Sequence, residues 1–333
     1  MDNVTHSLTG LALARAGLNR VSCGAVLLLL LSANIPDIDI TGLLRGQLCY
    51  LELHRGYTHS LLALPIMAGL CILLAAPFLR HKVLRLGRAY ALCCVGVASH
   101  LLLDWTNSYG VRLWLPFSSR WLHLDLNGLY DDWILAILAF AAVWPLFAKL
   151  VSSEIGERPA SGRGTAIAAL VFFVLFDGAR FMFHARAVEQ LNARLYEDAP
   201  AVQVAALPNS SNPLRWLGVV ETARAYSLLE LDVIAPLNVE AAHAFYKPQI
   251  TAGLLKVKAT PPFRYFSYFA RFPVWSEQPA VLRTGTGRRY ELTDLRFGTP
   301  GAGSFHCVAL INEAGSVLND RFTFGSGQDL GWP

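Results

Sequence analysis

Long apolar segments fill the first half of the chain, and short alternating segments fill most of the second half. Residues 61–79 carry no charged side chain, and a helix of about 20 apolar residues can cross a bilayer. Further apolar segments with polar flanks comprise residues 21–33, 89–103, 133–148 and 165–183. Residues 5–13 begin a shorter apolar helix, which at ~1.5 Å per residue cannot span and should pack inside a bundle. The pattern predicts about six membrane segments.

Beyond residue 213, apolar and polar positions alternate as they do in half-buried strands, with Gly, Pro and Asn between the segments. The strands predicted in this way comprise residues 216–221, 226–233, 264–272, 290–297, 305–311 and 317–324. Residues 184–198 predict a polar amphipathic helix, and residues 199–213, with three prolines, predict a linker. The predicted architecture is an α-helical membrane bundle at 1–183, an exit helix and linker at 184–213, and a small antiparallel β or α+β domain at 214–333.

Composition supports a membrane protein with room for one further domain. The chain has 333 residues, of which 54% are apolar and 16% charged. The net charge of +4 indicates no partner by itself, and we expect membrane lipids but no nucleic acid as partners. The six cysteines form no Cys-x-x-Cys pair, so neither a thiolate zinc site nor a redox pair is predicted. The sequence does not fix the oligomeric state.

Basic residues are unevenly divided between the two sides of the predicted bundle. If the first helix runs inward and the segments alternate, one side holds Arg15, Arg20, Arg80, Lys82, Arg85, Arg88, Lys149, Arg158 and Arg163. The opposite loops hold only Arg45, Arg55, Arg112 and Arg120. Because Lys and Arg accumulate on the cytoplasmic side, the first set should be cytoplasmic. The N-terminus and residues 184–333 are then predicted to be extracytoplasmic.

Seven side chains that favour metals fall at the outer ends of the predicted helices. They are His6, Asp37, Asp39, His54, His59, His100 and Asp104. Imidazole and carboxylate together suit zinc, manganese or magnesium, and ionisable groups near lipid are costly unless they have a function. Seven ligands are too many for one tetrahedral ion, so we expect a divalent metal cofactor of one or two ions.

Each motif also has a structural interpretation. His100 and Asp104 are four residues apart on one helix face, where they can chelate an ion or face interfacial water. Asp37 and Asp39 follow a proline and can converge on a cation, although an acidic turn after a membrane helix would look the same.

The remaining histidines stand beside capping residues. His59 follows Thr58, and His6 lies in a similar Thr-His-Ser string, so each is also consistent with a residue that stands beside a helix N-cap. His54 taken alone is equally consistent with an interfacial polar residue. Because four separate segments bring His or Asp to one side of the membrane, we favour a metal site.

These motifs resemble the YdjM-type bacterial inner-membrane proteins, a family described as membrane-bound metal-dependent hydrolases. The resemblance covers about residues 1–150 and is carried by Thr-His-Ser at 5–7, Pro-Asp-Ile-Asp at 36–39, His-Arg-Gly-Tyr-Thr-His-Ser at 54–60, and the pair His100 and Asp104. It implies metal-dependent hydrolysis in a bacterial inner membrane, with the seven side chains above at the metal.

The sequence therefore predicts a hydrolase at the outer membrane–water interface, with metal-bound water as the nucleophile and a lipid-linked ester or phosphoester as the substrate. A metal-binding transporter and a non-catalytic membrane scaffold are the alternatives. A transporter should carry ionisable groups through the whole depth of the bilayer, whereas here they cluster at one end of the predicted bundle, which argues against that alternative. Arg55 could contact an anionic substrate from outside the ligand set, but we favour a role in topology or lipid-headgroup binding.

Four further charged residues lie near the predicted outer ends. Asp177 and Arg180 are three residues apart and could pair on one helix face, and we favour a structural ion pair there over a contact with the site. Asp131 and Asp132, at a helix start, could complement the helix dipole, or one could be an outer-shell ligand.

Overall fold

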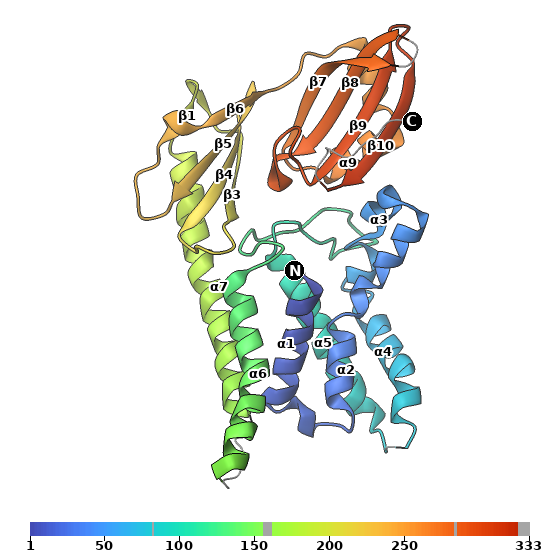
Figure 1. The fold of residues 1–333 in the computed structure, drawn as a ribbon, viewed down its shortest axis with the longest axis vertical. Helices are drawn as coiled ribbons and strands as arrows, with labels where there is room; N and C mark the ends of the chain where they lie inside the picture. Colours follow the sequence, from blue (N-terminus) through green and yellow to red (C-terminus); the bar gives the residue numbers. More distant parts are fainter. Residues whose placement is uncertain (82, 156–161, 283–284, 326–333) are drawn as a thin grey trace. The chain divides into compact units, whose positions relative to one another are not determined.

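The computed structural model describes residues 1–81, 83–155, 162–282 and 285–325 (Figure 1). The chain packs as two compact units. Unit 1 comprises Met1–Ile40, Leu53–His184 and Pro208–Pro213. Unit 2 comprises Thr41–Glu52, Ala185–Leu207 and Leu214–Pro333. Lys82 and Arg158, counted above for the predicted topology, lie outside the described residues.

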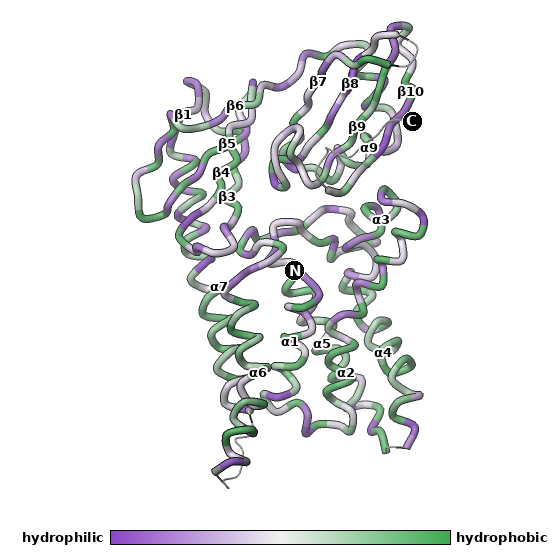
Figure 2. The backbone as a smooth tube through the Cα atoms, viewed as in Figure 1, coloured by the Kyte–Doolittle hydropathy of each residue, from purple (hydrophilic) through white to green (hydrophobic). Residues whose placement is uncertain are grey.

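Apolar helices build the first unit, as the sequence predicted. They are α1 (Asn3–Ala16), α2 (Ala25–Ser32), α4 (Leu64–Leu79), α5 (Leu86–Thr106), α6 (Asp132–Ile155) and α7 (Arg163–Asn192), and the short 3₁₀ helices η1 (Leu18–Arg20), η2 (Ile35–Arg45) and η3 (Tyr57–His59) lie between them along the chain. Figure 2 shows their mostly hydrophobic colouring. Among the described residues, α5, α6 and α7 are long and apolar enough to cross a membrane, and the number rises to five if two bent helix pairs each form one span. Six spans remain a prediction.

Small residues let the helices approach closely enough to gather the candidate ligands. A Cβ on Gly10 would lie 2.8 Å from the carbonyl oxygen of Leu29, and one on Gly96 would overlap the side chain of Ser32. These two glycines therefore set the close contacts of α1 and α5 with α2, as small residues do in membrane bundles. A buried apolar cluster of α2, α4 and α5 lies beside these contacts.

Arg180 has a different ion-pair partner from the one the sequence suggested. Its guanidinium lies 2.8 Å from Asp131, and it also donates to the carbonyl oxygens of Leu126 and Asn209. Asp177 instead accepts from the side chain of Asn127 at 3.0 Å. Asp131 also accepts from backbone N–H groups in the first turn of α6, so it stabilises the start of that helix as expected. In the described residues, these groups join neither of the metal-ligand groups found below.

The second unit contains two four-stranded sheets. The first has the order β3 (Gln203–Pro208), β4 (Arg215–Glu221), β5 (Ala225–Asp232), β6 (His243–Tyr246). The second has the order β10 (Val317–Phe324), β9 (Phe305–Asn312), β8 (Gly285–Asp294), β7 (Pro273–Leu282). The β4–β5, β5–β6, β7–β8, β8–β9 and β9–β10 pairs are antiparallel. The unit also contains β1 (Leu195–Tyr196), β2 (Ala199–Pro200), η4 (Val239–Ala241), α8 (Ala252–Lys258), α9 (Pro261–Phe269) and η5 (Leu295–Phe297).

Two local predictions for this region are wrong. Residues 264–272, predicted as a strand, lie largely in α9, because Phe263, Phe266 and Phe269 recur at helical spacing and are all buried on one face. The predicted linker at 199–213 contains β2 and β3, whose prolines Pro200 and Pro208 are the last residues of these strands, a position where proline is tolerated. The other five predicted strands overlap β4, β5, β8, β9 and β10.

A short segment from the N-terminal half packs as part of the second unit. Within Thr41–Glu52, the helix α3 (Gln47–Leu53) accepts hydrogen bonds from the Tyr265 hydroxyl at the carbonyl oxygens of Leu51 and Glu52, at 3.4 and 3.2 Å. The backbone N–H of Phe324 donates to Gln47 at 3.2 Å. The chain on either side of this segment continues directly into the turns that carry Asp37, Asp39, His54 and His59.

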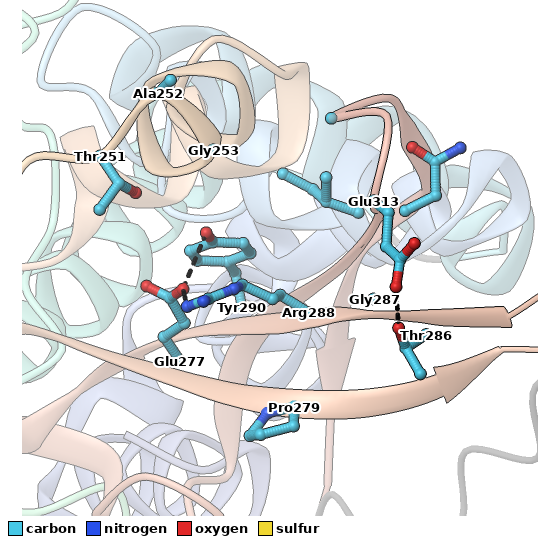
Figure 3. A pocket seen from close by; sticks show the side chains of 13 residues that line it. Thr251, Ala252, Gly253, Glu277, Pro279, Thr286, Gly287, Arg288, Tyr290 and Glu313 are labelled. Atoms are coloured by element: carbon cyan, nitrogen blue, oxygen red, sulfur yellow. Dashed lines mark hydrogen bonds and ion pairs between the residues drawn. The ribbon is translucent and has the colours of Figure 1, made fainter.

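The described part of the second unit also has an open pocket of about 710 Å³ (Figure 3). Its polar side chains already bond one another: Glu277 accepts from the Tyr290 hydroxyl at 3.1 Å and pairs with Arg288, and Thr286 donates to Glu313. We therefore place the candidate chemistry in the first unit.

Candidate metal centre

All seven predicted ligands lie in the first unit, on four segments. His6 is on α1, Asp37 and Asp39 are on η2, and His54 and His59 flank the turn that contains Gly56. His100 and Asp104 are one turn apart on α5, as their spacing predicted. His6, His59, His100 and Asp104 are fully buried.

Four of these side chains direct one ligand atom each toward a common point, and we call them the inner group: Asp37, His59, His100 and Asp104. Nε2 of His59 lies 3.1 Å from Nε2 of His100 and 3.4 and 3.3 Å from oxygens of Asp37 and Asp104. Nε2 of His100 lies 3.6 and 3.4 Å from the same carboxylates. A tetrahedral ion with ligands at about 2.0–2.1 Å requires ligand separations of roughly 3.3–3.4 Å, so the group fits a divalent ion.

Neighbouring groups orient the inner ligands. Nδ1 of His100 lies 2.7 Å from the carbonyl oxygen of Ala33, which can only accept, so Nδ1 carries the proton and Nε2 is left with its lone pair. Nδ1 of His59 lies 3.0 Å from the Thr58 hydroxyl and 3.3 Å from a carboxylate oxygen of Asp39, to which that hydroxyl also donates, so the two groups hold the ring in place. Oδ2 of Asp104 is buried and has no hydrogen-bond partner in the described part of the chain. A cation at this point would satisfy it.

A second set, the outer group, comprises Asp37, Asp39 and His54. Its three ligand atoms lie within 4.8 Å of one another, and Asp37 belongs to both groups. Asp39 accepts from Nδ1 of His54 and from the backbone N–H of Arg55, both at 3.0 Å. Asp39 thus fixes the turn between the two histidines as well as offering a ligand atom. The cluster can hold a metal, while the metal's identity and the number of ions remain predictions.

His6 lies beside the inner group without belonging to either set. Its ring stacks on His100, with centroids 3.8 Å apart and planes inclined by 17°. Its Nε2 is 3.4 Å from Oδ1 of Asp104, and neither ring nitrogen has a hydrogen-bond partner among the described residues. The structure therefore brings six of the seven predicted residues into two overlapping groups and places His6 next to them.

The Arg55 side chain points into the site rather than to the surface. It is 2% exposed, and its guanidinium lies 2.8 Å from Oδ1 of Asp104, an oxygen that the Met1 amino group also contacts. The guanidinium lies over the ring of Tyr109, 4.7 Å from its centroid, and donates to the carbonyl oxygen of Gly110 at 3.3 Å. Arg55 has a positive φ of 52°, which few residues other than glycine adopt.

Sequence reasoning missed the loop that follows α5. Its residues 107–127 close on themselves through bridges between Asn107 and Asn127 and between Val111 and Leu122. The loop carries Arg112, whose guanidinium lies 4.7 Å from the ring centroid of Trp121. Its only signal in the sequence was that Arg112 is one of few basic residues on the predicted outer side.

Comparisons with known proteins agree with the placement of the site in the helical half. The family model described as YdjM inner membrane protein matches residues 1–187, which include all seven candidate ligands. An uncharacterized protein of Bacillus subtilis (strain 168), YfhP, is 29% identical over 153 residues, or 43% of this chain. That match covers 46% of YfhP, so the chain spans about half the length of this relative. No solved structure matches the chain. Because the family model covers more than half of its residues, the chain belongs to the YdjM family of inner membrane proteins.

Proposed function

We propose that the protein is a metal-dependent hydrolase of the bacterial inner membrane. Its site lies where the extracytoplasmic side of that membrane meets water. The observation that carries the proposal is the spacing of the inner group: its two imidazole nitrogens lie 3.1 Å apart and 3.3–3.6 Å from the oxygens of Asp37 and Asp104, close to the separations that a tetrahedral ion requires. A divalent ion at such a site supplies a nucleophile by lowering the pKa of water and polarises the oxygen of the bond to be cleaved.

The protein's own side chains hold and orient that ion. His59 and His100 present their Nε2 atoms, and Asp104 uses one oxygen for the inner group while the other pairs with Arg55. Because these side chains are buried, bulk water does not surround them, and their electrostatic interactions are stronger than in water. Asp37, with its side chain 13% exposed, is the most accessible inner ligand and marks the side from which a substrate would approach.

The proposed substrate is a lipid-linked ester or phosphoester. The uneven distribution of Lys and Arg along the chain supports an extracytoplasmic position for the ligand-bearing helix ends. At that depth an amphiphilic molecule would keep its apolar part in the bilayer and bring its polar group to the metal. Membrane lipids are therefore the expected partners.

The test is a parallel measurement of metal content and hydrolysis. Purified protein in detergent should contain one or two divalent ions and cleave lipid phosphoesters or lipid esters faster than matched soluble analogues. His100→Ala and Asp104→Ala should lose metal and activity together, whereas His243→Ala, an exposed histidine outside both groups, should change neither. Cleavage that persists in the two ligand variants would refute the proposal.

One observation favours a second candidate function. The inner group already supplies four ligands, which is typical of structural zinc sites, whereas catalytic sites keep an open position. A metal-stabilised membrane scaffold would bind the ion, lose thermal stability on chelation and hydrolyse none of the tested substrates. The same two measurements, extended by a melting curve with and without chelator, separate the two functions.

A further inference from the structure

We infer that Arg55 and Arg112 form an anion subsite beside the inner group and bind the phosphoryl group of a phosphoester substrate. The inference rests on the proposed hydrolase function and narrows its substrate class, because it selects phosphoesters over neutral carboxylic esters.

The backbone fixes the two arginines together. The N–H of Arg112 donates to the carbonyl oxygen of Arg55 at 3.1 Å. The N–H of Arg55 donates to Asp39 in turn, which holds its unusual positive φ in place. Such strain in a residue next to a ligand is typical of a functional site, where the surrounding contacts maintain it.

The guanidinium of Arg55 is placed to bind more than Asp104. A guanidinium has five N–H donors, and the contacts of Arg55 with Asp104 and with the carbonyl oxygen of Gly110 use NH2 and NH1. Its Nε is buried and has no hydrogen-bond partner in the described part of the chain. A buried donor without an acceptor is costly, and an anion at the site would supply one.

Arg112 occupies a space that Gly56 keeps open. A Cβ on Gly56 would lie 2.7 Å from a terminal nitrogen of the Arg112 guanidinium and 2.7 Å from the carbonyl oxygen of Leu53, closer than real Cβ atoms approach. The same guanidinium lies over Trp121 and reaches the carbonyl oxygen of His54 at 3.4 Å. The glycine in the His-Arg-Gly segment therefore leaves room for the Leu53 carbonyl oxygen and for a second arginine at the turn that carries His54 and His59.

The charges around the site select an anionic ligand once metal is bound. With neutral histidines, the carboxylates of Asp37, Asp39 and Asp104 are balanced by the guanidiniums of Arg55 and Arg112 and by the Met1 amino group that contacts Asp104. One divalent ion then leaves two positive charges, and a second ion raises the positive charge further. A neutral ester would leave that charge uncompensated among buried groups, which is unfavourable, whereas a phosphoester brings a compensating negative charge.

Binding of inorganic phosphate tests the subsite directly. Zinc-loaded full-length protein in detergent would be titrated with phosphate by calorimetry, and zinc would be measured by mass spectrometry. Arg112→Gln should weaken phosphate binding by about 10- to 100-fold, the effect of losing one or two charge-assisted hydrogen bonds, with zinc content unchanged. Gly56→Ala, whose Cβ crowds both the Arg112 guanidinium and the Leu53 carbonyl oxygen, should also weaken phosphate binding. Arg120→Gln, an exposed arginine, is the matched control.

The outcomes separate this inference from the proposed function. Wild-type phosphate affinity in both Arg112→Gln and Gly56→Ala would overturn the subsite, even if the protein cleaves neutral lipid esters and so remains a hydrolase. Arginine-dependent phosphate binding without any hydrolysis would keep the subsite and remove the hydrolase. Comparing short-chain phosphatidic acid with glycerol 3-phosphate then assigns the bound phosphoryl group to a lipid headgroup or to a soluble molecule.

Discussion

The carboxylate of Asp37 is the one ligand that both metal groups share, so its removal should have the widest effect on metal binding. Asp37→Ala takes one of four ligands from the inner group and one of three from the outer group. Changing His100 to Ala instead affects only the inner group, and changing His54 affects only the outer one. The three variants therefore give different patterns of metal loss.

The expected magnitude follows from the number of ligands. Four-ligand sites bind zinc with a free energy of about 10–16 kcal/mol, so each ligand contributes roughly 2.5–4 kcal/mol to the binding. Loss of one ligand should then weaken the binding of an ion by about 10²- to 10³-fold. Asp37→Ala should lower the affinity for every bound ion by this factor. His54→Ala should leave the affinity for the most tightly bound ion at the wild-type value.

The assay is competition with a chromophoric chelator of known zinc affinity, performed on purified protein in detergent. Glu240→Ala, an exposed carboxylate of the second unit, serves as the control. Size-exclusion chromatography shows whether each variant remains folded. If Asp37→Ala keeps wild-type zinc affinity, or if His54→Ala and His100→Ala weaken the same ion equally, the assignment of two groups joined at Asp37 is wrong.

Reporter fusions at Ala160 and after residue 333 should read as cytoplasmic and extracytoplasmic, respectively, and a C-terminal fusion active only in the cytoplasm would overturn the topology. Arg180→Met should lower the free energy of unfolding by about 3–5 kcal/mol because it leaves Asp131 buried without its ion-pair partner; Asp131→Asn in the same background should recover part of the loss in a denaturation series. Tyr265→Phe removes the hydroxyl that bonds α3, so amide exchange within residues 41–52 should accelerate; unchanged exchange would contradict the contact.

Local patterns in the sequence were enough to predict the helical half and several strands. The uncharged run at 61–79 contains α4, and the spacing of His100 and Asp104 placed both on one face of α5. Alternation predicted β4, β5, β9, β10 and the end of β8. These predictions succeed because burial of one face imposes a period on neighbouring residues.

The same reasoning failed where the apolar residues of one segment fit both the helical and the strand spacing. Aromatic residues at 263–269 alternate well enough to predict a strand, yet burial of Phe263, Phe266 and Phe269 against the second unit stabilises a helix. Period alone cannot choose between a helix and a strand in a short apolar run, because the tertiary contacts decide which face is buried.

The residue types of the site were visible in the sequence, but their arrangement was not. Nothing in the chain's local pattern indicates that Asp37 joins two groups, that Arg55 turns inward to Asp104, or that Gly56 makes room for Arg112. These contacts join residues tens of positions apart. They depend on helices brought together at small residues and on a loop that closes on itself, and only the packed structure specifies such geometry.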